Sequence, residues 1–155
     1  MSDKDYLYHK QNNKRTAEIA AKFLCEIDSS FKILDKKEKG ILVSAFASKN
    51  KIVYGRAFDI IKLRKDVNLM DHKEITENLE NITLYEIKST SRKLKKDFKG
   101  YFFSLSTAEL LTAQNLREHF KFIFVNTKSK EFFELTLQEL FAKSKNIYPS
   151  WSISF

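Results

Sequence analysis

The segment Asn81–Thr90, NITLYEIKST, predicts a β-strand rich in apolar and β-branched residues, and the fold prediction starts from it. Glu86 and Lys88 interrupt this strand two positions apart, so their side chains point to one side and Ile87 points to the other. Burying two charges on a core strand is costly unless they pair with each other or bind a metal ion. A plain ion pair within the strand is one explanation of the pattern, and an active site is the other.

A second acid is available upstream. The stretch Lys51–Leu63, KIVYGRAFDIIKL, is rich in β-formers and predicts a neighbouring strand that contains Asp59, separated from the first strand by a polar segment, 64–80. Carboxylates on adjacent strands can hold Mg²⁺ through hard oxygen ligands. Such an ion activates a water molecule and neutralises a phosphate, while Lys88 would stabilise charge developing on the phosphate oxygens. The pattern therefore favours phosphodiester hydrolysis.

An acidic residue two positions before a lysine is a common pattern in this chain. It occurs four times, beginning at Asp35, Asp71, Glu86 and Asp97. Only Glu86 lies in an apolar strand, and the other three lie in charged runs typical of solvated surface. Asp71 nevertheless stays a rival to Asp59 as the second acid, although its surroundings, LMDHKE, are not strand-like.

Further helices and strands are expected around these two strands. Residues 14–27 have the apolar spacing of an amphipathic helix, after a polar segment, 1–13, that we expect to be flexible. Capping boxes at Ser106 and Thr136 predict helices over about 107–119 and from 137 to about 145. KFIFVN (121–126) predicts a buried strand, SWSISF (150–155) a final strand, and ILVSAFA (41–47) fits either a helix or a strand. The step from 81–90 through the helix at 107–119 to 121–126 has the length of a parallel βαβ crossover. The predicted fold class is α/β (α+β), a mixed central sheet flanked by helices.

This order of elements, together with Asp59 and the triplet Glu86-Ile87-Lys88, resembles the PD-(D/E)xK nuclease superfamily, which includes many restriction endonucleases and Holliday-junction resolvases. The resemblance covers about residues 14–126 and implies a restriction-endonuclease-like core. It implies Mg²⁺, or Mn²⁺, as the cofactor, with Asp59, Glu86 and the Ile87 carbonyl as its ligands and Lys88 as the catalytic lysine. Members often add an acid from the first helix, and Glu18 is the matching position, although an ordinary exposed glutamate explains Glu18 equally well.

Two features depart from the superfamily pattern. Asp59 follows Phe58, where many members have proline, and the separation between Asp59 and Glu86 is longer than in compact members.

The charge of the chain favours a polyanionic partner such as nucleic acid. Net charge is +8 from 28 basic and 20 acidic residues. A basic run directly follows the Glu86 strand, and it either clamps a phosphate backbone or forms a solvated loop; it contains Arg92, Lys93, Lys95, Lys96 and Lys99. The aromatic residues at 101–103, 122, 124, 132 and 133 fit core packing better than base stacking.

Other classes of protein receive little support from the sequence. Cys25 is the one cysteine, so no disulfide can form within the chain, and no apolar run approaches the roughly 20 residues that span a bilayer. We therefore expect a cytoplasmic, single nuclease-like domain over 1–155. The three histidines lack the spacing of zinc ligands, and there is no Gly-rich phosphate loop.

The leading functional hypothesis is a Mg²⁺-dependent endonuclease acting on DNA, of a restriction or defence type or the catalytic subunit of one. It would work as a homodimer or with a larger nuclease partner, and we expect no membrane among its partners. The alternative is a non-catalytic nucleic-acid-binding or assembly subunit with a degenerate nuclease core. A third hypothesis is an interaction protein in which Glu86 and Lys88 form a structural pair.

Overall fold

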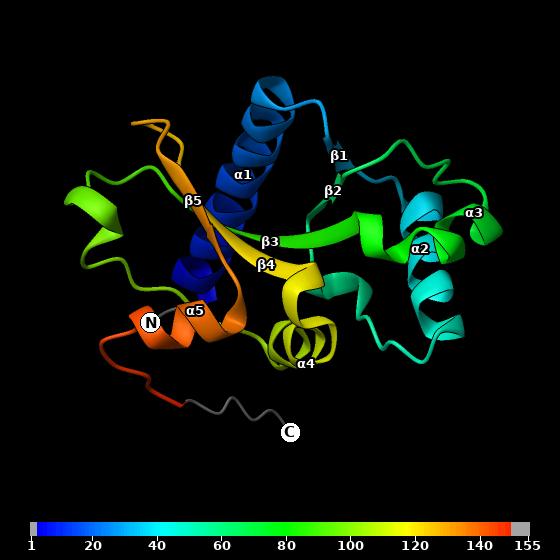
Figure 1. Cartoon of the computed structure of the whole chain (residues 1–155). Coiled ribbons are helices and arrows are strands. Elements are labelled where there is room, and N and C mark those ends of the chain that lie inside the picture. Colours follow the sequence, from blue (N-terminus) through cyan, green and yellow to red (C-terminus); the bar gives the residue numbers. More distant parts are fainter. Residues whose placement is uncertain (1–2, 150–155) are drawn as a thin grey trace.

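The computed structural model describes residues 3–149 and has an α+β architecture built on a five-stranded mixed sheet (Figure 1). The strand order is β1 (Phe31–Ile33), β2 (Ile60–Leu63), β3 (Ile82–Thr90), β4 (Phe120–Asn126) and β5 (Phe132–Leu135). Neighbouring strands are antiparallel except β3 and β4, which are parallel. The predicted crossover is therefore confirmed, because α4 (Thr107–Leu116) lies between these two strands in the chain.

Both faces of the sheet are covered by helices. The helix α1 (Asp3–Ile27) packs Ala20, Ala21 and Leu24 against one face, where they meet inward residues of β2, β3 and β4. The opposite face is buried by α2 (Lys36–Ser48), α4 and α5 (Leu137–Lys143). Side chains of β3 alternate between these two cores, so its two charged positions lie on the face of α2 and α4. None of the helices in residues 3–149 combines the length and apolar character that crossing a bilayer requires.

Local capping fixes where the covering helices begin. Asp35 accepts hydrogen bonds from the first turn of α2 and forms a capping box with Glu38. The two capping boxes expected from the sequence are present, at Ser106 with Glu109 and at Thr136 with Glu139. A further short helix, α3 (His72–Glu77), is capped by Asp71 and lies in the excursion between β2 and β3.

Several element boundaries differ from the sequence prediction. The strand expected over 51–63 is shorter than predicted and comprises only β2. The preceding residues, 51–59, are irregular, with a 3-10 turn at Gly55–Ala57. Asp59 therefore precedes the strand. The undecided stretch 41–47 is helical and belongs to α2. The first helix begins at Asp3 rather than near Lys14. The sequence did not predict its first turns because they are polar and carry no apolar periodicity. The strand expected at 150–155 lies outside the described residues.

Candidate active site

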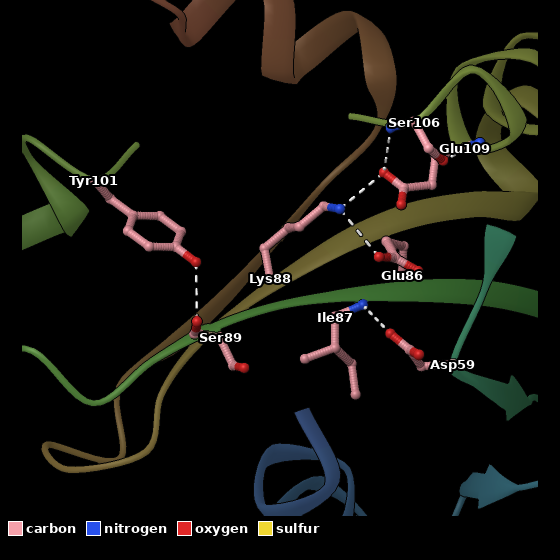
Figure 2. Close-up of polar contacts among 8 residues, drawn as sticks. All are labelled: Asp59, Glu86, Ile87, Lys88, Ser89, Tyr101, Ser106 and Glu109. Atoms are coloured by element: carbon pink, nitrogen blue, oxygen red, sulfur yellow. Dashed lines mark hydrogen bonds and ion pairs between the residues drawn. The ribbon is translucent and has the colours of Figure 1, made fainter. Parts of the chain in front are cut away.

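Glu86 and Lys88 occupy the predicted same-side positions on β3. Ile87 between them is buried in the core that α1 covers, whereas both charged side chains extend from the other side of the strand (Figure 2). Lys88 Nζ donates a hydrogen bond to Glu86 Oε1 at 3.0 Å. Both side chains are only 11–12% exposed, so this contact is held away from bulk water.

Lys88 has a second anionic partner that the sequence did not indicate. Its Nζ donates to Glu109 Oε2 at 2.8 Å, and Glu109 as a whole is 8% exposed. The same carboxylate oxygen accepts the backbone N–H of Ser106 at 3.2 Å, which completes the capping box of α4. One glutamate therefore both starts α4 and fixes the amine of Lys88 (Figure 2).

Asp59 lies beside Glu86, just before β2. The backbone N–H of Asp59 donates to the carbonyl of Tyr85 at 2.8 Å, which extends the β2–β3 register by one step and sets Asp59 opposite Glu86. Asp59 Oδ2 accepts the backbone N–H of Ile87 at 2.9 Å (Figure 2). The carboxylate is thus oriented by β3 itself, and Asp59 as a residue stays exposed to solvent. The structure brings together Asp59, Glu86 and Lys88, as the sequence predicted.

A second lysine reaches this cluster from α2. Lys39 Nζ donates to the carbonyl of Phe58 at 2.6 Å and lies 4.2 Å from the centre of the Phe58 ring. Burial lowers the pKa of Lys39, and the negative charges of Asp59 and Glu86 oppose that effect. Lys39 was missed in the sequence because it belongs to a charged run, KKEKG, that resembles ordinary helix surface.

The electrostatics of the cluster centre on Glu86. Burial, helped by the negative charges of Asp59 and Glu109 and opposed by Lys88, raises the pKa of its carboxyl to about 9. Burial alone would lower the pKa of Lys88, but Glu86 and Glu109 reverse the effect and raise it. At neutral pH the raised pKa keeps the proton on Glu86, so Lys88 then donates its hydrogen bond to a neutral carboxyl.

The donor set of this cluster fits a hard divalent cation. Asp59 and Glu86 lie opposite each other where β2 and β3 meet, and a cation would offset both the burial and the neighbouring negative charges that raise the Glu86 pKa. Within residues 3–149, no group of three or more His, Cys, Asp or Glu side chains is arranged to hold a metal, so water or substrate oxygens would complete the shell. The Ile87 carbonyl stays a predicted ligand, and the N–H of the same residue donates to Asp59.

Two other predicted acids are placed differently. Asp71, the rival to Asp59, is the N-cap of α3, where its carboxylate accepts the backbone N–H groups of Lys73 and Glu74. Glu18 is exposed on α1, and its side chain makes no hydrogen bond or ion pair with a residue that the structure describes. A contribution of Glu18 to the site therefore has no support in this geometry.

The basic run lies beyond the end of β3. All five of its cationic residues are exposed, and they are Arg92, Lys93, Lys95, Lys96 and Lys99. Most of the neighbouring aromatics pack inward as expected: Phe122 and Phe124 are buried, and Tyr101 and Phe103 pack against the same core. Phe102 and Phe132 differ from that expectation, because they are 78% and 45% exposed.

The assignment of this site rests on the chain's own geometry. Comparisons with protein-family models, with curated proteins and with solved structures give no match for the chain.

Proposed function

We propose that this protein is a Mg²⁺- or Mn²⁺-dependent endonuclease that hydrolyses phosphodiester bonds in DNA, with a restriction-endonuclease-like core of the PD-(D/E)xK type. The observation that carries the proposal is the meeting of Asp59, Glu86 and Lys88 where β2 and β3 run side by side. Two acids and a lysine at this point match the residue types that the resemblance requires. The sheet, with β3 and β4 parallel and α4 between them, is also the arrangement that the resemblance implies.

Each residue would have a distinct task. Asp59 and Glu86 would hold the divalent ion, which supplies the chemistry of activating a water molecule and neutralising a phosphate. Lys88 would place its ammonium group beside the phosphate whose charge increases in the transition state. Glu109 would keep that amine in place, because it accepts one of its hydrogen bonds at 2.8 Å.

One observation favours the second candidate, a non-catalytic nucleic-acid-binding or assembly subunit. Lys88 donates hydrogen bonds to both Glu86 and Glu109, so its buried amine has its partners within the protein. In that case the cluster would be a structural network, which is worth retaining when every member has a partner.

Cleavage of supercoiled plasmid by the pure protein, with Mg²⁺ or Mn²⁺ and with EDTA, tests the proposal. The Lys88→Gln variant keeps a hydrogen-bond donor but has no charge to stabilise the transition state, so it should cleave at least about 100-fold more slowly. The control variant Lys99→Ala lies in the exposed basic run and should bind more weakly while still cleaving at saturating protein. Binding without metal-dependent cleavage by the wild type would support the second candidate instead.

A further inference from the structure

The positive charge of the chain is concentrated in two segments. Residues 91–99 and 127–131 together contain seven lysine or arginine residues and two acids, a net charge of +5 out of +8 for the whole chain. The first segment follows β3, and the second is the turn between β4 and β5. Figure 1 shows both at the left of the molecule, at the end where β3 and β4 finish. The sequence indicated only the first of them.

Hydrogen bonds join these two segments into one surface. Asn126, 3% exposed, donates from Nδ2 to the carbonyl of Arg92 at 3.0 Å. Its Oδ1 accepts the backbone N–H groups of Lys128 and Ser129. The backbone N–H of Thr127 donates to the carbonyl of Thr90 at 2.9 Å. A single buried asparagine therefore fixes the turn against the start of the basic run.

Apolar residues of the basic run also anchor it to the hydrophobic core. Phe98 is 8% exposed and packs edge-on against Phe124 and Phe133, and Leu94 packs against the same core. With these apolar residues anchored, the cations between them are directed outward. None of the seven cations forms an ion pair with a residue in 3–149, so no acid compensates their charge. The amine of Lys130 lies 4.9 Å from the centre of the Phe23 ring, a contact that leaves its positive charge in place.

We infer that residues 91–99 and 127–131 form one phosphate-binding surface for nucleic acid. In this surface Lys128 and Lys130 contact phosphates just as the lysines of the basic run do. The inference rests on the proposed function, because it places this surface next to the cleavage site. Lys88 lies two residues before the end of β3, which at about 3.3 Å per residue is about 7 Å. That is about two base-pair steps of a duplex, so a backbone that passes Lys88 would continue over the basic surface.

The experiment measures the affinity of a short labelled DNA duplex by fluorescence anisotropy, in EDTA, from about 0.05 to 0.2 M salt. The test variant is Lys128→Gln with Lys130→Asn. Asparagine is chosen because Lys130 has φ of +62°, a left-handed conformation that asparagine tolerates. The matched control is Lys65→Gln with Lys73→Gln, which removes two exposed lysines near α3, at the right of Figure 1.

The test variant should bind about tenfold more weakly at 0.1 M salt, and its salt slope should fall by about 2, one for each phosphate that no longer meets a lysine. The control should keep the wild-type slope. Lys128→Glu alone should weaken binding further than Lys128→Gln alone. This pair of single variants tests the inference if the double variant folds poorly.

Failure of this inference can be told apart from failure of the proposed function. If the test variant binds DNA with the wild-type slope, the turn is not part of the surface, even if the protein cleaves DNA. If the slope falls as expected but neither the wild type nor any variant cleaves DNA with Mg²⁺ or Mn²⁺, the surface stands and the nuclease proposal fails. Binding to vesicles rich in phosphatidylserine, with none to DNA, would overturn the inference.

Discussion

The carboxyl of Glu86 should cost the folded protein stability at neutral pH, and Glu86→Gln should remove that cost. A raised pKa means that the folded protein holds a proton that the unfolded chain releases above the ordinary value of 4.5. The contribution is thus fully present below pH 4.5 and is lost as pH rises towards about 9, at about 1.4 kcal/mol per pH unit. From 4.5 to 7 is 2.5 pH units, so Glu86→Gln should raise the free energy of unfolding at pH 7 by about 3 kcal/mol.

Urea unfolding in EDTA, followed from pH 4 to 9, measures this effect. The gain of Glu86→Gln should be near zero at pH 4 and should grow with pH, because glutamine cannot ionise. The control is Glu118→Gln, whose side chain is 84% exposed and whose substitution should leave the pH dependence of wild type unchanged. A variant less stable than wild type at pH 7 would refute the reasoning, since it would mean that Glu86 is ionised and stabilised by Lys88.

Three further predictions concern the residues around Glu86 and the basic surface. Glu109→Gln should lower the free energy of unfolding by about 2 kcal/mol, because it removes the buried anion of Lys88 but keeps the capping box. Glu139→Gln, at the same position of an exposed capping box, should change stability little in the same urea titration. Mn²⁺ at about 100 times its dissociation constant should stabilise the protein by about 2.7 kcal/mol and release a proton, seen by calorimetry in two buffers, and Asp59→Asn should abolish both. Asn126→Ala should cost about 2 kcal/mol and weaken DNA binding, since three backbone groups would be left without their buried partner.

The central part of the fold could be predicted because its signals are local. The strand β3 shows in the β-forming, largely apolar composition of residues 82–90, and α4 and α5 show in their capping boxes. The three-residue strand β1 gives no pattern of its own and forms only because it pairs with β2. The helix α2 was undecided because ILVSAFA is apolar on successive residues, and its start is defined by Asp35 rather than by periodicity.

The candidate site was predicted in part for a similar reason. Glu86 and Lys88 interrupt an apolar strand, which is visible in the chain, and Asp59 lies at the head of the neighbouring strand. Lys39 and Glu109 reach the cluster from helices distant in sequence, so only tertiary packing places them there. Glu109 also had a sufficient local explanation as the capping glutamate of α4, and that explanation concealed its second interaction, with Lys88.

The most direct test of the account compares two single substitutions in a metal-dependent cleavage assay. Asparagine at position 59 can still accept the N–H of Ile87, and asparagine at position 71 can still cap α3, so both variants should stay folded. If Asp59 holds the divalent ion, Asp59→Asn should reduce the rate of plasmid cleavage in Mg²⁺ by at least about 100-fold, while Asp71→Asn should cleave like wild type. Equal cleavage by wild type and Asp59→Asn, or loss of cleavage only in Asp71→Asn, would contradict the assignment of the site.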